Sequence, residues 1–187
     1  MSQTTVLALV GSLRAASVNR QVAETAVSVA PEGVEVIIFD GLGDVPFYNE
    51  DIDGAAPIPA VEALREAAGR ADALLLVTPE YNGTVPAVLK NAIDWISRPY
   101  GSGAVQGKPV AVISASPSVN GGRWAHEDTR KTARIAGGNV LEDVTLAIGR
   151  TGEKFADGHP KENLEVAEQV AGVVISLADA TRQLVDA

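Results

Sequence analysis

The chain has 187 residues, of which 46% are hydrophobic and 21% charged, close to globular averages. These values exclude a disordered or fibrous chain and allow a substantial core within one domain, residues 1–187. Its 24 acidic residues outnumber 15 basic ones, giving a net charge of -9, so we expect neither nucleic acid nor an anionic membrane as a partner. The absence of cysteine excludes disulfides, thiolate metal sites and a cysteine nucleophile.

Five short apolar runs predict β-strands, and each ends at a glycine, a proline, an aspartate or other turn-forming residues. The runs cover residues 5–10, 34–39, 73–77, 109–114 and 140–148. The fifth run is weaker, because Glu142 and Asp143 interrupt it. Runs without alternation of apolar and polar residues favour strands buried on both faces, as in a parallel sheet.

Five helical patterns alternate with the strands, at residues 18–29, 59–68, 85–95, 122–136 and 161–184. Alternating strands and helices predict a doubly wound α/β sheet. No apolar run approaches the ~20 residues that cross a bilayer, and the first run is too short for a secretion signal. We therefore expect a cytoplasmic protein without a membrane partner.

The loop after the first strand carries groups that suit a phosphate. Gly11 permits a tight turn, Ser12 and Ser17 supply hydroxyls, Asn19 supplies an amide and Arg14 a delocalised cation. The loop also leads into the positive end of a helix. It matches neither the P-loop nor the glycine-rich dinucleotide pattern, so we predict a site for a terminal monophosphate. The alternative is a helix cap at Ser17 and a solvated Arg14.

The loop after the third strand is stiffened at both ends by Pro79 and Pro86, and it holds one of only three tyrosines, Tyr81. Asn82 and Gly83 form a strong turn signal. Such a loop could present backbone N–H groups and a ring to a planar heterocycle, although it could equally be an ordinary surface turn.

The sequence PEYNGTVP at residues 79–86, followed by LKNAIDW at residues 89–95 and preceded by the phosphate loop, resembles the NADPH-dependent FMN reductase family. This flavodoxin-like group includes bacterial quinone and chromate reductases and azoreductase-like enzymes. The resemblance extends over nearly the whole chain. It implies a flavodoxin-like, doubly wound, five-stranded parallel sheet in the order 2-1-3-4-5, with helices on both faces.

The resemblance also assigns cofactor-binding residues. It implies that the FMN phosphate is held by Ser12, Arg14, Ser17 and Asn19. It implies that the isoalloxazine ring is lined by Pro79, Glu80, Tyr81, Asn82 and Gly83, with Thr84 where the family often has serine. A further flavin contact is implied near Ser116, in the small-residue loop after the fourth strand.

The implied chemistry is that of the flavin, and no residue is predicted as an essential acid or base. NADPH or NADH would donate a hydride, and a small-molecule electron acceptor would then be reduced in a ping-pong sequence. The implied acceptors are quinones, free flavins, azo compounds, nitroaromatics and chromate. An electron-carrying flavodoxin and a redox-sensing flavin module are the alternatives. The arginine in the phosphate loop and the few aromatic residues, 4% of the chain, argue against the carrier.

The resemblance implies a homodimer or homotetramer. The helix at residues 85–95 is one expected contact, with Trp95, Ile96 and Tyr100 as an apolar patch or, alternatively, as part of the core. Arg123 and Trp124 at the start of the next helix are expected at a subunit interface.

The remaining polar groups give weaker signals. His126 and His159 lack the spacing of metal ligands, so no metal site is predicted. Neighbouring positions on a helix point to different faces, so His126 and Glu127 do not form one site. The acidic stretch at residues 48–53 is expected to be a solvated loop, although in the family such a loop can approach a neighbouring subunit's site.

Overall fold

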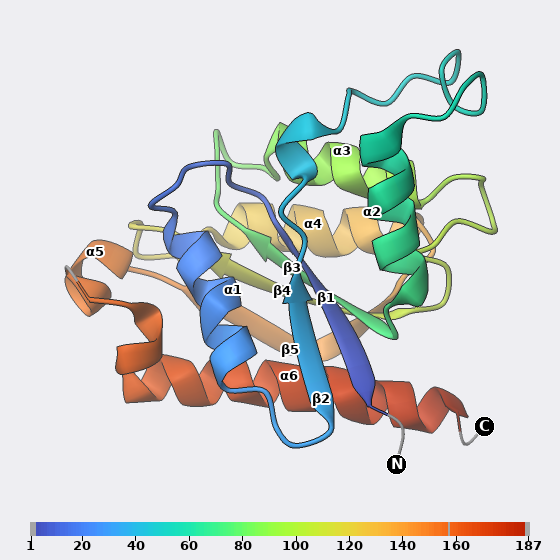
Figure 1. Cartoon of the computed structure of the whole chain (residues 1–187). Coiled ribbons are helices and arrows are strands. Elements are labelled where there is room, and N and C mark those ends of the chain that lie inside the picture. Colours follow the sequence, from blue (N-terminus) through green and yellow to red (C-terminus); the bar gives the residue numbers. More distant parts are fainter. Residues whose placement is uncertain (1–2, 157, 186–187) are drawn as a thin grey trace.

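A computed structural model describes residues 3–156 and 158–185. Its centre is a parallel sheet in the order β2-β1-β3-β4-β5, which confirms the predicted fold class (Figure 1). The strands are β1 (Thr4–Val10), β2 (Val34–Ile38), β3 (Ala73–Thr78), β4 (Pro109–Ala115) and β5 (Asn139–Ile148). Each lies within one residue of its predicted bounds.

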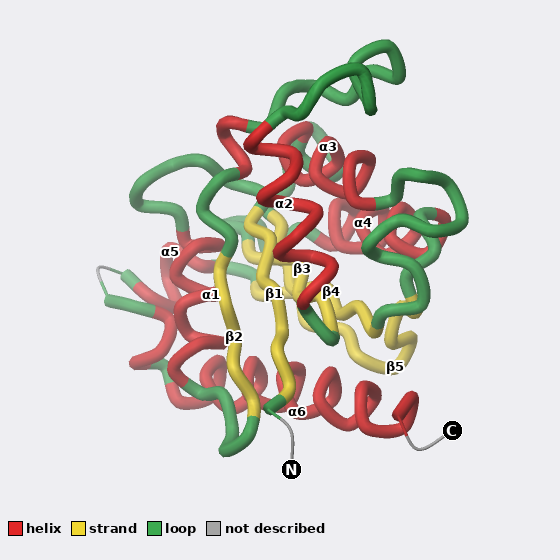
Figure 2. Tube along the Cα trace, turned by 45° about the vertical axis from the view of Figure 1, so that its right-hand side comes forward, coloured by secondary structure: helices red, strands yellow, loops and turns green. Residues whose placement is uncertain are grey.

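Helices cover both faces of the sheet, as Figure 2 shows. One face packs against α1 (Val18–Ser28) and α6 (Leu164–Val185), and the other against α2 (Pro59–Arg70), α3 (Ala87–Ile96) and α4 (Arg123–Ile135). A short helix, α5 (Thr151–Phe155), follows β5, and 3₁₀ turns span Leu42–Asp44 and Pro160–Glu162. None of the described helices combines the length and apolar character needed to cross a membrane.

Side chains of the central strands enter two separate cores. In β1, Val6 and Ala8 pack with α1 and α6, whereas Leu7 and Leu9 pack with α2 and α3. Strands β3 and β4 are buried along their whole length. The outer strands β2 and β5 alternate between buried and more exposed positions, which corrects the expectation that all five strands are buried on both faces.

The helices differ from prediction at a few ends. Pro86 is the residue before α3 rather than part of it, so α3 begins at Ala87, because proline has no N–H and fits best at or just before a helix start. The last helix begins at Leu164, after the 3₁₀ turn that starts at Pro160. Helix α5 was not predicted, because five residues are too few to display a helical period.

Candidate functional site

A cavity of about 580 Å³ lies at the carboxyl ends of the strands, the edge where doubly wound sheets bind ligands. Its volume falls within the roughly 300–1,000 Å³ common for small-molecule sites. Four segments supply its wall: the loop after β1 with the start of α1, the loop after β3, the loop after β4, and the segment after β5.

The start of α1 forms one wall of the cavity. Ser17 is buried and caps the helix, because its Oγ accepts from the Arg20 backbone N–H at 3.4 Å. Val18 and Asn19, the first two residues of α1, line the cavity. Amides at these positions have no partner within a helix, and the first turn carries no acidic side chain that would offset the helix dipole. The wall is therefore suited to an anion.

Two buried polar atoms on this wall have no hydrogen-bond partner within the described residues: Ser12 Oγ and Asn19 Oδ1. Asn19 Nδ2 donates to the Ala115 carbonyl at 3.0 Å, and a carbonyl can only accept, so Oδ1 is the free end of the amide. Because unpaired buried polar groups are costly, these two atoms indicate a polar ligand that accepts from Ser12 and donates to Asn19.

Two arginines near this wall have different surroundings. Arg20 pairs with Asp40 and with Glu24, and the Asp40 carboxylate raises the pKa of Arg20. Arg14 is exposed and lines the cavity. It also lines an adjoining hollow of about 340 Å³ on the side of Arg20 and Asp40. Arg14 is therefore the loop cation available to a ligand.

The loop after β3 folds into a two-residue turn. Asn82 and Gly83 have φ values of 53° and 77°, and Tyr81 and Thr84 bond reciprocally through their backbones at 3.3 and 3.2 Å. Positive φ at both central residues is the reason for the Asn-Gly pair. Tyr81, 49% exposed, lines the cavity.

The loops after β1 and β3 approach each other closely. A Cβ at Gly11 would lie 3.2 Å from Pro79 Cδ and 3.3 Å from Leu89 Cβ, so a glycine at this position lets the two loops meet.

The segment after β5 closes the cavity, although no sequence motif pointed to it. Backbone hydrogen bonds tie it to the loop after β4: Ser116 N to Ile148 O at 3.0 Å, Arg150 N to Ser118 O at 3.0 Å, and Thr151 N to Ser116 O at 3.3 Å. Its lining residues are Thr151, Gly152, Phe155, Ala156 and Gly158. This segment could have been predicted from its position alone, since β5 also ends at the ligand-binding edge of the sheet.

Seven of the eleven predicted cofactor-binding residues line the cavity: Ser12, Arg14, Asn19, Pro79, Glu80, Tyr81 and Ser116. The other four lie in the same segments but do not line the cavity. Ser17 caps α1, while Asn82, Gly83 and Thr84 complete the turn that carries Tyr81.

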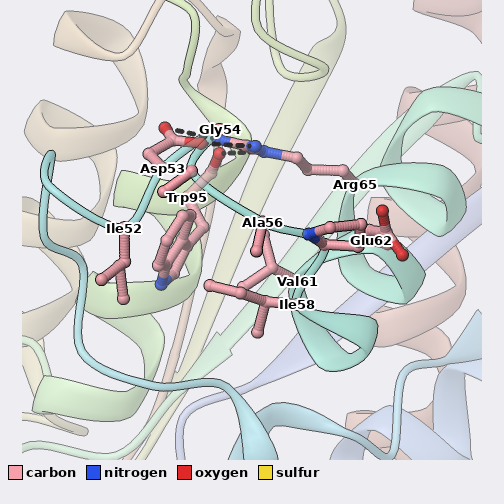
Figure 3. A pocket seen from close by; sticks show the side chains of 11 residues that line it. Ile52, Asp53, Gly54, Ala56, Ile58, Val61, Glu62, Arg65 and Trp95 are labelled. Carbon is pink, nitrogen blue, oxygen red and sulfur yellow. Dashed lines mark hydrogen bonds and ion pairs between the residues drawn. The ribbon is translucent and has the colours of Figure 1, made fainter.

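A separate hollow of about 300 Å³ lies where α2 and α3 meet the loop of residues 52–58 (Figure 3). Arg65 donates to both carboxylate oxygens of Asp53, at 2.8 and 2.9 Å, and to the Trp95 carbonyl at 3.1 Å. Arg65 lowers the pKa of Asp53 through these bonds. Arg65 and Asp53 in this hollow are thus paired with each other, and its lining shares no residue with the 580 Å³ cavity.

These contacts and the burial of nearby side chains correct one expectation and decide between two alternatives for another. The acidic stretch 48–53 is not simply solvated, because Asp53 is held by Arg65 and the Tyr48 ring packs edge-on against Trp95 at 4.9 Å. Trp95 and Ile96 are fully buried, which confirms the alternative that they belong to the core, whereas Tyr100 is 86% exposed.

His126 is buried on α4, and its Nε2 lies 3.0 Å from the Val112 carbonyl. Because the carbonyl accepts, Nε2 carries the proton. Burial lowers the pKa of His126. The adjacent Glu127 is exposed and pairs with Arg123, so the two side chains point apart as predicted. Within residues 3–156 and 158–185, no cluster of histidine and carboxylate side chains could hold a metal ion.

The chain is similar in sequence and in fold to several known proteins. The model of the NADPH-dependent FMN reductase family matches residues 4–153. A quinone reductase of Pseudomonas putida is 48% identical over 158 residues, 84% of each chain. A probable NADPH:quinone oxidoreductase 1 of Oryza sativa subsp. japonica is 40% identical, covering 96% of this chain and 92% of that protein. The solved flavoenzyme NAD(P)H:(acceptor) oxidoreductase FerB of Paracoccus denitrificans is 33% identical, with a TM-score of 0.84, covering 96% of this chain and 98% of that chain.

Proposed function

The chain belongs to the NADPH-dependent FMN reductase family, and we propose that it passes a hydride from NAD(P)H, by way of bound FMN, to a quinone. Family membership confirms the expected FMN and NAD(P)H. The observation that carries the proposal is the cavity at the start of α1, where Arg14 and two unpaired buried polar atoms meet the loop of Tyr81.

The residues of the cavity fit FMN. Arg14, the Ser12 hydroxyl and the first amides of α1 are donors that would hold the phosphate. The free Asn19 Oδ1 is an acceptor and would suit a ribityl hydroxyl better than a phosphate oxygen. Pro79, Tyr81 and the loop at Ser116 would flank the ring. FMN supplies the capacity to take up a hydride and release two electrons.

We propose quinones as the main acceptors. The support is the set of relatives named for quinone reduction, including a 2-hydroxy-1,4-benzoquinone reductase of Burkholderia sp. that is 42% identical over 125 residues. We extend the proposal to free flavins, azo compounds, nitroaromatics and chromate. Tyr81 at the cavity is half-exposed and would leave room for such molecules to approach.

The order of events is proposed to be ping-pong, because donor and acceptor would use the same face of one cavity in turn. Initial rates should be measured with varied NADPH at several fixed benzoquinone concentrations, and then with NADH. Double-reciprocal plots should give parallel lines. Intersecting lines would mean that both substrates are bound together, which contradicts a shared site. The NADPH and NADH series give the donor preference as a ratio of kcat/KM.

We also propose a homodimer or homotetramer that uses the start of α4. Trp124 is 60% exposed there, and a Cβ built on Gly83 would lie 3.6 Å from its ring. Val119, in the neighbouring loop, is 76% exposed. Light scattering should give a multiple of the chain mass for the wild type and a smaller mass for Trp124→Ser. A monomeric wild type would contradict the proposal.

A further inference from the structure

Helix α4 begins without a cap from its own sequence. Its N-cap residue is Gly122, in the left-handed conformation with φ 76°, and it has no side chain to accept a hydrogen bond. The first amides of any helix need partners from outside the helix. Arg123 is the first helical residue, so the amides of the next two residues, Trp124 and Ala125, are among those that need one.

Glu80 supplies that partner from the loop after β3. Its Oε2 accepts from Trp124 N at 3.0 Å and from Ala125 N at 3.1 Å. A carboxylate at the positive end of a helix is favourable both as a charged acceptor and through the helix dipole. The two backbones are also close, since a Cβ at Gly122 would lie 3.3 Å from Glu80 Cβ.

Two further contacts join the same segments. Thr84 Oγ1 donates to Asp128 Oδ2 at 2.7 Å, from the end of the turn to the second turn of α4. The Trp124 ring lies next to Gly83, because a Cβ at Gly83 would be in van der Waals contact with that ring. The loop at residues 79–84 and the helix that follows the Ser116 loop are therefore held together by side chains that do not depend on a ligand.

We propose that Glu80 is a positioning residue that caps α4 and thereby fixes two walls of the cavity, the Pro79–Tyr81 wall and the Ser116 wall, at the spacing needed for the flavin ring. In this role Glu80 acts through α4 rather than by bonding to the flavin. The inference rests on the proposed placement of FMN in this cavity.

The test compares Glu80→Ala with Glu80→Gln and with the control Glu127→Ala. Glu127 lies on α4 and pairs with the Arg123 side chain. FMN affinity is measured by flavin fluorescence, and amide hydrogen exchange is measured on the flavin-free proteins. Glu80→Ala should weaken FMN binding about tenfold, the scale of one lost helix cap, and speed exchange at Trp124 and Ala125. Because the glutamine carbonyl oxygen can accept the same bonds, Glu80→Gln should recover most of the affinity. Glu127→Ala should match the wild type.

Three results would overturn the proposal. In the first, the Trp124 and Ala125 amides of the wild type exchange hydrogen as fast as amides in an uncapped first turn. Another is wild-type FMN affinity in Glu80→Ala. The third is Glu80→Gln binding as weakly as Glu80→Ala with its amides still protected, which would assign a direct role to the charge. If Glu80→Ala does not fold, wild-type exchange and Glu80→Gln decide the matter. These readouts need no turnover, so failure of NADPH oxidation would refute the proposed function without affecting this test.

Discussion

Arg14 and Arg20 lie close together in the sequence, yet only one of them is available to a ligand. Arg20 is committed to Asp40 and Glu24, and together they form a charge cluster beside the loop. Arg14 lines the cavity beside the unpaired Ser12 hydroxyl. The phosphate assignment therefore depends on Arg14, whose planar guanidinium suits phosphate oxygens.

Replacing Arg14 by alanine should weaken FMN binding about ten- to hundredfold, the range for loss of a charged hydrogen bond. Riboflavin, which lacks the phosphate, should bind the variant and the wild type with similar affinity. Fluorescence titration of both ligands measures this, and Arg70→Ala, a paired surface arginine on α2, is the control. Equal weakening of FMN and riboflavin would refute the phosphate assignment.

His126 should make the stability of the protein depend on pH. Its folded pKa is lowered by burial, whereas in the unfolded chain a histidine titrates near pH 6.5. Between those two pKa values the unfolded state binds more protons, so the free energy of unfolding falls as pH falls, by up to about 1.4 kcal/mol per pH unit. Above about pH 7.5 the effect is absent.

His126→Gln tests this directly, because its amide can still donate to the Val112 carbonyl but does not titrate in this range. Urea unfolding between pH 8 and pH 5.5 should show a steeper loss of stability in the wild type than in the variant. All other titratable groups are common to both proteins, so their contributions cancel in the comparison. Equal pH slopes would contradict the account.

At the scale of elements, the Asn82-Gly83 turn can be tested by a substitution that changes only the backbone preference. Gly83 has a φ of 77° and Gly33, in the turn before β2, has a φ of 81°. Alanine at either position meets similar backbone strain, and a Cβ at Gly33 would meet nothing within 4 Å. The pair thus separates the effect of strain from the effect of location.

Both Gly83→Ala and Gly33→Ala should lower the free energy of unfolding by about 1 kcal/mol, because alanine rarely adopts positive φ. Only Gly83→Ala should also weaken FMN binding, since that turn carries Tyr81. Urea unfolding and flavin titration of the two variants measure this. If Gly83→Ala keeps full flavin affinity despite its strain, the turn does not position the ring.

Elements built from local patterns were predictable, and those built from distant partners were not. Apolar runs located all five strands, most clearly the central ones, whose burial in a parallel sheet favours continuous apolar residues. The Glu80 cap joins residues 44 apart, and Arg65 joins the acidic loop to α3 through Asp53 and Trp95, so neither leaves a local signal. The segment at α5 was also missed, because non-glycine residues of positive φ at Arg150 and Ala156 shape it.

At the scale of the whole molecule, a chain of net charge -9 provides a site for an anion. The mean field of the surface is screened within about 10 Å at ordinary ionic strength, so groups at the site decide binding. We propose that those groups are Arg14 and the start of α1, which line the cavity at the carboxyl edge of the sheet. The fold would thus create a local positive region in a chain whose net charge is negative.

The central claim is that this cavity holds FMN in a position to receive a hydride from NAD(P)H. It is tested most directly by adding NADPH anaerobically to the purified protein reconstituted with FMN and following the visible flavin spectrum. The account predicts rapid bleaching to the two-electron reduced form and recovery of the oxidised spectrum on adding a quinone. A bound flavin that NADPH leaves oxidised would contradict the reductase and favour an electron carrier or sensor, and failure to bind FMN at all would contradict the site itself.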